Sequence, residues 1–112
     1  MFIEYDDDTT IGMIEGDFGI VLPIEIEGIE ITTEDQFSIK IFKNINEEPI
    51  ITKTYSNISD NTIEFELTKE ESQLLKKGYY YYDLDWYQGN KFLGNLIANA
   101  RFKVLELSLI HI

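Results

Sequence analysis

The chain has 112 residues, 44% of them apolar and 13% aromatic, with only 2 prolines and 7 glycines. This length and composition exclude a disordered tail and predict a single domain, residues 1–112, that buries a core without metal or disulfide support. The absence of cysteine excludes disulfides, thiolate nucleophiles and zinc–thiolate sites. With 21 acidic and 9 basic residues the formal charge is -12, which opposes direct binding to nucleic acid phosphates and anionic membranes.

The N-terminal arm, residues 1–9, is acidic and contains Asp6-Asp7-Asp8. It lacks the basic head and apolar run of a signal peptide, and no stretch of the chain approaches the roughly 20 apolar residues that span a bilayer. We therefore expect the protein to be made in the cytoplasm and to remain there. The three aspartates lack the spaced loop and terminal glutamate of a calcium site, so they predict a solvated arm.

Apolar and polar side chains alternate along most of the chain, which is the period of β-strands with one buried face. The clearest case runs from Phe18 to Ile26, where every even position is apolar. Pro23, within this run, is expected to turn its nitrogen side to solvent. The alternation predicts seven strands, at about residues 10–15, 17–27, 37–43, 50–55, 62–67, 79–87 and 91–105.

A short helix is predicted between two of these strands, over about residues 69–77. Thr68 and Glu71 have the spacing of a capping box, in which each side chain bonds to the other residue's main-chain N–H. Leu74 and Leu75 are expected to press the helix onto the strands, and Gly78 to end it in a left-handed conformation.

The strand after Gly78 is predicted to have two distinct faces. Its inward residues are expected to be Tyr80, Tyr82, Leu84 and Trp86. Its outward residues are expected to be Tyr79, Tyr81, Asp83 and Asp85, because carboxylates mark the wet face. Gln88-Gly89-Asn90 then predicts a tight hairpin. The closing strand is predicted to kink or bulge at Gly94. Its buried face is expected to hold Phe92, Gly94, Leu96, Ala98, Ala100, Phe102 and Val104.

Tyr80 also fits the tyrosine corner of immunoglobulin-like sandwiches, in which a tyrosine hydroxyl bonds back to the chain where it crosses between sheets. Short strands joined by polar turns favour two packed sheets. We therefore predict an all-β, immunoglobulin-like two-sheet β-sandwich of about seven strands, with one short helix at the corner between strands.

No catalytic, cofactor-binding or metal site is predicted. His111 is the only histidine, so no Ser-His-Asp triad or histidine metal site can be assembled from it within this chain. Asp83 and Asp85 project from one strand face roughly 7 Å apart, but alternating acids are expected on a wet face in any case. The sequence therefore predicts a protein that is not an enzyme.

The C-terminal tail, residues 106–112, is apolar beyond the last predicted strand. It either extends that strand within the fold or pairs with a neighbouring subunit by strand addition. The residues predicted to contact another protein are Leu107, Leu109, Ile110 and Ile112.

Four motifs carry a family resemblance. They are Gly16-Asp17, Leu67-Thr68 with Glu70-Glu71, Gly78-Tyr79-Tyr80-Tyr81-Tyr82-Asp83-Leu84, and Asn99-Ala100-Arg101-Phe102-Lys103-Val104. From about Ile14 to Leu105 the chain resembles the N-terminal immunoglobulin-like domain of phage baseplate upper proteins and related virion proteins of phages and prophages infecting Firmicutes. The resemblance implies synthesis in the bacterial host cytoplasm and a structural role in a virion, as a baseplate, tail or head decoration module. It also implies other virion proteins, or further copies in a homo-oligomer, as partners. The chain departs from the family because baseplate upper proteins usually carry long further segments.

Two other functions stay open at this point. The acidity would suit a small phage-encoded inhibitor that mimics nucleic acid and occupies a host nucleic-acid-binding protein. The outward Tyr79, Tyr81 and Tyr87 would suit a carbohydrate-binding module. Cross-strand pairing on an exposed sheet is the purely structural explanation for the same three tyrosines.

Overall fold

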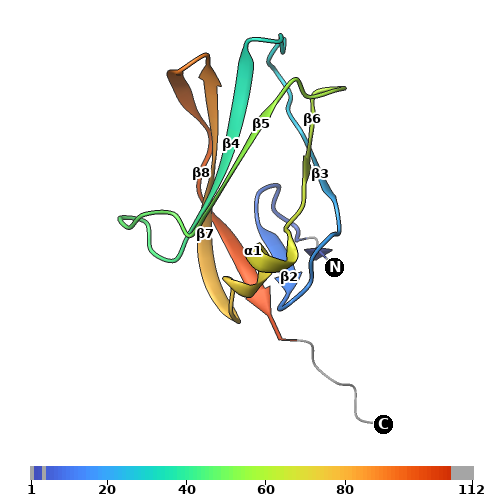
Figure 1. The fold of residues 1–112 in the computed structure, drawn as a ribbon, viewed down its shortest axis with the longest axis vertical. Coiled ribbons are helices and arrows are strands. Elements are labelled where there is room, and N and C mark those ends of the chain that lie inside the picture. The colour runs from blue at the N-terminus through green and yellow to red at the C-terminus, as the bar shows by residue number, and fades with distance from the viewer. Residues whose placement is uncertain (1, 4, 107–112) are drawn as a thin grey trace.

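The computed structural model describes residues 2, 3 and 5–106, which form β-strands and one short helix. Figure 1 shows the strands arranged as two facing layers. The elements are β1 (Phe2–Ile3), β2 (Ile11–Ile14), β3 (Leu22–Glu25), β4 (Asp35–Phe42), β5 (Ile51–Ser56), β6 (Thr62–Phe65), α1 (Lys69–Gln73), β7 (Gly78–Gln88) and β8 (Lys91–Leu105). The all-β sandwich predicted from alternation is therefore confirmed, with the short β1 as a strand that alternation did not reveal.

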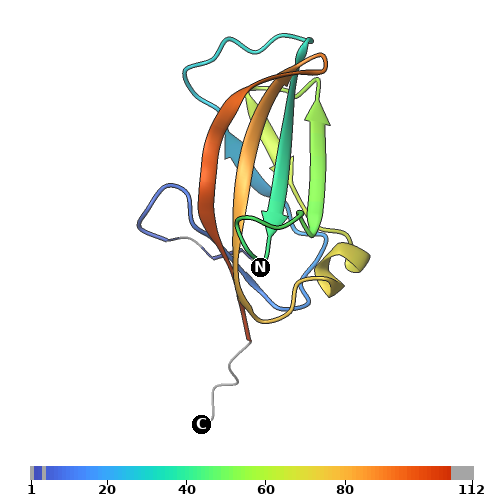
Figure 2. The same ribbon diagram turned by 90° about the vertical axis from the view of Figure 1, so that its left-hand side faces the viewer.

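The larger sheet has the strand order β1-β2-β8-β7-β4-β5, and β3 and β6 form the smaller sheet. Within the larger sheet β8 runs parallel to β2 and antiparallel to β7. Figure 2 shows the broad curved face of this sheet. The neighbouring strands β8, β7 and β4, faced by the β3–β6 pair, have the order of the G, F, C and B, E strands of an immunoglobulin fold.

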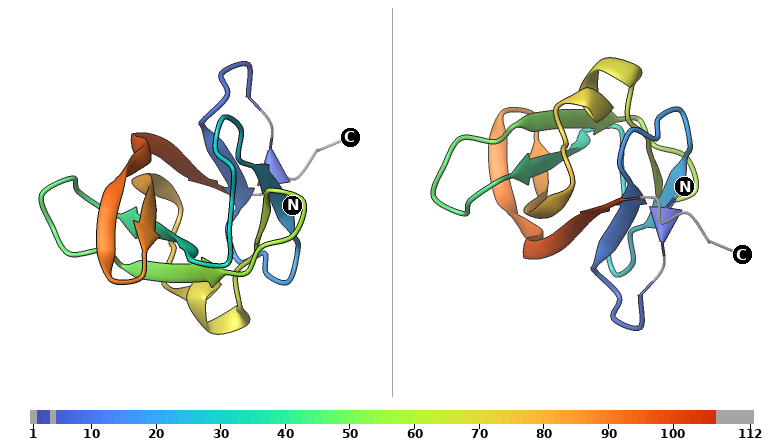
Figure 3. Two further views of the ribbon diagram at one scale, coloured as in Figure 1. Left: turned by 90° about the horizontal axis from the view of Figure 1, so that it is seen from above. Right: turned by 90° about the horizontal axis from the view of Figure 1, so that it is seen from below.

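The core lies between the two sheets, which Figure 3 shows from both ends. Phe102 of β8 is at its centre, because its ring meets that of Phe65 edge-on from the smaller sheet and that of Tyr82 edge-on from β7. Both pairs of ring centroids are 6.3 Å apart, within the range of favourable aromatic contacts. The other fully buried apolar side chains include Met13, Phe37, Ile39, Ile41, Ile63, Leu67, Leu75 and Val104.

The helical corner forms as predicted at its start. The Glu71 N–H donates to the Thr68 hydroxyl over 3.1 Å, and the Thr68 N–H donates to the Glu71 carboxylate over 2.9 Å, which completes the capping box. The tyrosine corner is also confirmed, because the Tyr80 hydroxyl donates to the Lys76 carbonyl over 2.7 Å. The capping box and the tyrosine hydrogen bond therefore hold the start and the end of the segment that connects β6 to β7.

The predicted end of the helix is wrong. Helix α1 stops at Gln73, and Leu74 caps it in a right-handed conformation with its N–H bonded to the Glu71 carbonyl. Gly78 is instead the first residue of β7, with φ 151°. Only one of the two leucines packs inward, because Leu75 is fully buried and Leu74 is exposed.

The predicted strand 17–27 is also shorter than expected. Only Leu22–Glu25 pair with β6, and the side chains of Phe18 and Ile20 are 50% and 44% exposed. The pairing is short because its partner β6 ends at Phe65, so the regular ladder does not continue along residues 17–21. Gly19, at φ 74°, donates its N–H to the Leu67 carbonyl and bends this segment across the end of the sandwich.

The alternation predicted for the closing strand is broken by three register shifts between β7 and β8, each adding one residue to β8. One of them lies next to Gly94, as predicted. Only Ala100, Phe102 and Val104 of the predicted buried face are buried, because each bulge moves the later residues of β8 to the opposite face. Phe92 is half exposed.

Two further predictions on β7 need correction. Asp85 was expected to face water, but it is buried. The Lys40 ammonium lies 3.2 Å from its carboxylate and the Asn95 amide donates to it, and these contacts stabilise the charge in the buried position. Trp86, expected in the core, is only partly buried. Its indole N–H donates to Asp35 over 2.8 Å, which holds the ring at the edge of the core.

Candidate functional site

Asp83 and Asp85, the acidic pair that the sequence suggested as possible catalytic residues, instead make contacts that support the fold. Asp83 accepts a hydrogen bond from the Asn99 N–H at 2.7 Å, and Asp85 is covered by Lys40 and Asn95. In the described part of the chain, no group of three or more histidine, cysteine, aspartate or glutamate side chains could hold a metal ion. Asp83 and Asp85 therefore stabilise the sheet and its bulges.

Asp35 is the most deeply buried carboxylate among the described residues. It accepts hydrogen bonds from the Thr32 N–H at 2.8 Å, the Trp86 indole at 2.8 Å and the Gln88 amide at 3.0 Å. These donors, first the Thr32 main chain and then the Trp86 and Gln88 side chains, hold the pKa of Asp35 below its ordinary value. This carboxylate joins the start of β4 to the end of β7.

The acidic arm is exposed at Asp6, Asp7 and Asp8, as predicted. Asp7 accepts hydrogen bonds from the main-chain N–H groups of Thr10 and Thr9, at 2.6 Å and 3.0 Å. The Thr10 main chain and hydroxyl lower the pKa of Asp7 to about 2. The central aspartate of the arm thus closes a local turn.

The four predicted contact residues, Leu107, Leu109, Ile110 and Ile112, lie outside the described residues. The structure shows where the chain leads into them. The Glu15 N–H donates to the Leu105 carbonyl over 2.7 Å, the Lys77 N–H donates to the Glu15 carboxylate over 2.5 Å, and Lys77 pairs with Glu106 at 3.0 Å. The end of β2, the turn after α1 and the end of β8 therefore meet at one end of the sandwich.

The segment after β2 and the end of α1 lie at this same end (Figures 1 and 2), and both carry exposed apolar side chains. We call these four residues the apolar end: Phe18, Ile20, Val21 and Leu74. Val21 and Leu74 are 46% and 55% exposed, close to the values for Phe18 and Ile20. Sequence patterns did not reveal the apolar end, because alternation predicted Phe18 and Ile20 to be buried.

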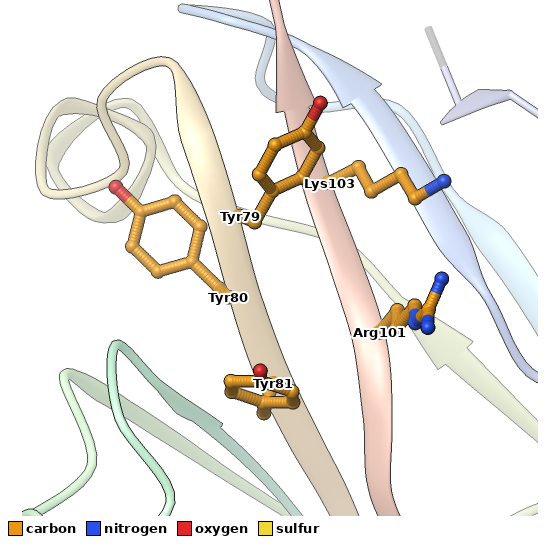
Figure 4. A pocket seen from close by; sticks show the side chains of 5 residues that line it. All are labelled: Tyr79, Tyr80, Tyr81, Arg101 and Lys103. Carbon is orange, nitrogen blue, oxygen red and sulfur yellow. The ribbon is translucent and has the colours of Figure 1, made fainter.

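A second feature lies on the outward face of the larger sheet, where β7 and β8 pair. Tyr79 is opposite Lys103 in the ladder and Tyr81 is opposite Arg101. With Tyr80 these side chains line an open depression of about 360 Å³ (Figure 4). Figure 4 shows the Tyr79 ring beside Lys103, whereas Tyr80 turns to the other side of β7. We call Tyr79, Tyr81, Arg101 and Lys103 the sheet-face patch.

The two cations of the sheet-face patch differ in exposure, because Arg101 is exposed and Lys103 is partly buried. Arg101 is exposed and forms no ion pair with any residue in the described ranges. The Lys103 ammonium lies 4.7 Å from the centroid of the Tyr5 ring, a cation–π contact. Nearby, the Lys43 ammonium lies 4.5 Å from the Tyr80 ring and donates to the Tyr79 carbonyl over 3.3 Å. This corner of an acidic protein is therefore locally positive.

Tyr87, grouped with Tyr79 and Tyr81 from the sequence, is not part of this patch. It lies near the other end of β7, roughly 26 Å from Tyr79 at about 3.3 Å per residue. Its ring packs against Phe92 with centroids 5.4 Å apart, and its hydroxyl is 3.1 Å from the Lys40 ammonium. The structure thus separates the predicted trio into two tyrosines that line the depression, of which Tyr79 is exposed and Tyr81 partly buried, and one tyrosine engaged in packing.

The chain matches no protein-family model, and comparison with curated proteins and with solved structures finds no match either. Among the residues that the structure describes, none belongs to a helix with the length and apolar character required to cross a bilayer. The functional argument therefore depends on the surfaces described above.

Proposed function

We propose that the protein is a non-enzymatic structural component of a phage or prophage virion, and that it works by protein–protein assembly. The observation that carries the proposal is the apolar end, where β8 leads into the tail that holds Leu107, Leu109, Ile110 and Ile112. The resemblance in the corner and closing-strand motifs supplies the virion context.

The physical support is the cost of leaving this end in water. Burying apolar surface gains about 25 cal/mol for each Å² removed from solvent. Phe18, Ile20, Val21 and Leu74 each expose close to half of their surface. The sequence after Glu106 contains four further large apolar residues. Apolar surface gathered at one end of a charged protein is typical of an interaction site, and a second virion protein or a second copy of the chain would cover it.

A shortened chain ending at Glu106 tests the proposal. It keeps the Leu105 carbonyl that Glu15 contacts and the Glu106 carboxylate that Lys77 contacts. We expect the full chain to self-associate in light scattering, or to bind another virion protein, and the shortened chain to lose this association while its circular dichroism stays β-rich. The double variant Ile20→Ser, Leu74→Ser should weaken the association in the full chain.

Phe92→Ser is the matched control, because Phe92 is also half exposed but lies by the hairpin at the opposite end of the sandwich. It should leave the association unchanged. The proposal would be contradicted if light scattering gave the same association state for the full chain, the shortened chain and both variants, and if mass spectra of purified particles of the source phage or prophage did not contain the protein. The nucleic-acid mimic stays a prediction that no described contact supports.

A further inference from the structure

We infer that the sheet-face patch is a binding site for an anionic saccharide, a sugar that carries carboxylate or phosphate groups. In this site Tyr79 and Tyr81 contact the apolar faces of the sugar rings, and Arg101 and Lys103 bind the anionic groups. The site is separate from the apolar end and does not depend on the assembly proposal.

The first argument is the geometry of the four side chains. Tyr79 and Lys103 form one cross-strand pair, and Tyr81 and Arg101 form the next pair on the same face. Residues two apart on a strand are roughly 7 Å apart, so the site repeats one tyrosine and one cation at that spacing. The repeat matches adjacent groups of a short saccharide, and the depression of about 360 Å³ between the side chains is open to solvent (Figure 4).

The second argument is that the two cations of the patch have no ion-pair partner among the described residues and stand opposite tyrosines. Lys40, Lys53 and Lys77 each form an ion pair, with Asp85, Glu71 and Glu106 respectively. Arg101 and Lys103 form no ion pair with any residue of the described ranges, which is also true of Lys43, Lys69, Lys76 and Lys91. Arg101 and Lys103 differ from these four lysines because they lie two residues apart on one strand and each is opposite a tyrosine. Two cations without an ion-pair partner among the described residues, beside a tyrosine that is 70% exposed, are groups that can bind an anionic ligand.

The third argument decides the class of ligand. β7 and β8 are interior strands, because β7 pairs with β4 on one side and β8 pairs with β2 on the other. Their main-chain groups are used in the sheet, so a peptide cannot bind here by adding a strand. A ligand must bind through side chains alone, which favours ring stacking on tyrosine together with bidentate contacts from arginine. The net charge of -12 repels an extended polyanion such as nucleic acid, whereas a short saccharide carries few charges.

Titration of the full ¹⁵N-labelled chain with trigalacturonate, followed by two-dimensional NMR, tests the inference. We expect saturable shifts of the amide signals of residues 79–81 and 101–103. Maltotriose is the neutral comparison and glucose 6-phosphate the phosphate-bearing one. Loss of a charge-assisted contact in Arg101→Gln or Lys103→Gln should weaken binding by about tenfold or more. Tyr79→Ala should weaken it as well.

Lys91→Gln and Phe92→Ala are the matched controls, because they remove an exposed cation and an exposed aromatic ring at the other end of the same hairpin. Both should bind trigalacturonate as the unaltered chain does. The spectrum of each variant shows directly whether it has kept its fold. No saturable shifts with either anionic sugar would overturn the inference, as would equal binding of maltotriose. Tighter binding of hexaglutamate would also overturn it, since the site would then prefer an acidic peptide.

Discussion

The carboxylate of Asp83 on β7 accepts a hydrogen bond from the main-chain N–H of Asn99 on β8, at a distance of 2.7 Å. Asn99 has φ 54°, and the ladder between the two strands shifts by one residue at this point. A side chain of one strand therefore stabilises the bulge of its neighbour. The bulge in turn sets the register that brings Arg101 opposite Tyr81 and Lys103 opposite Tyr79.

Replacing Asp83 by alanine should weaken this bulge. The change removes one hydrogen bond to a charged acceptor that is only partly buried, so the free energy of unfolding should fall by about 1 kcal/mol. Urea denaturation followed by tryptophan fluorescence measures it. Glu64→Ala on β6 is the control, since this exposed carboxylate has no hydrogen bond or ion pair with a described residue and its loss should change stability little. Equal stability of both variants would show that the bulge does not need Asp83.

Asp35→Asn should be the more damaging change. The carboxylate is buried and accepts four hydrogen bonds, and the amide nitrogen of an asparagine in its place would face hydrogen-bond donors. We expect a loss of about 2–3 kcal/mol in the free energy of unfolding, the usual range for hydrogen bonds to a charged group. Glu34→Gln, an exposed neighbour that loses the same charge, should be nearly neutral. A loss below 0.5 kcal/mol, roughly the scatter of surface substitutions, would contradict this account.

The same carboxylate should make stability depend on pH in the acid range. Its hydrogen bonds lower the pKa of Asp35 in the folded protein, whereas the unfolded chain has a value near 3.9. The folded state therefore gains stability above about pH 4, and this gain is lost as pH falls through the folded-state pKa. The free energy of unfolding should fall more steeply between about pH 5 and pH 2 in the unaltered protein than in Asp35→Asn. Parallel curves for the two proteins would exclude Asp35 as the source.

The tyrosine corner predicts a small and specific effect. Tyr80→Phe removes the hydroxyl that donates to the Lys76 carbonyl and leaves the buried ring in place. The expected loss is about 1 kcal/mol of the free energy of unfolding. Tyr79→Phe is a matched control on the neighbouring residue, whose ring is largely exposed, and should leave stability unchanged. If both variants unfold at the same urea concentration, the corner bond contributes nothing measurable.

The parts of the fold that the sequence predicted are those set by local contacts. The capping box of Thr68 and Glu71 and the hydroxyl bond of Tyr80 each join residues three or four positions apart, so their spacing can be seen in the sequence. The hairpin at Gly89 and the bulge at Gly94 are local in the same sense. Phe18 and Ile20 were misplaced because their burial depended on how far β6 continues.

The sheet-face patch could not be found by the same means. Counted back from the hairpin turn, an unbroken ladder places Ala100 opposite Tyr79. The three extra residues of β8 replace Ala100 with Lys103 and bring a pair of cations beside the tyrosines. Only the bulge at Gly94 was predicted, and the other two depend on side chains such as Asp83 on the neighbouring strand. The apolar end was missed for a related reason, because a regular alternation was extended past the last paired residue.

The parallel pairing of β2 with β8 also has a consequence for biosynthesis. Strand β8, which follows all the other described strands in the chain, occupies an interior position of the larger sheet between β2 and β7. Until residue 105 has left the ribosome, β2 has no neighbour other than the two-residue β1, and the edge of β7 stays uncovered. The sheet therefore closes only after β8 has been made, and until then the edges of β2 and β7 are open to pairing with other chains.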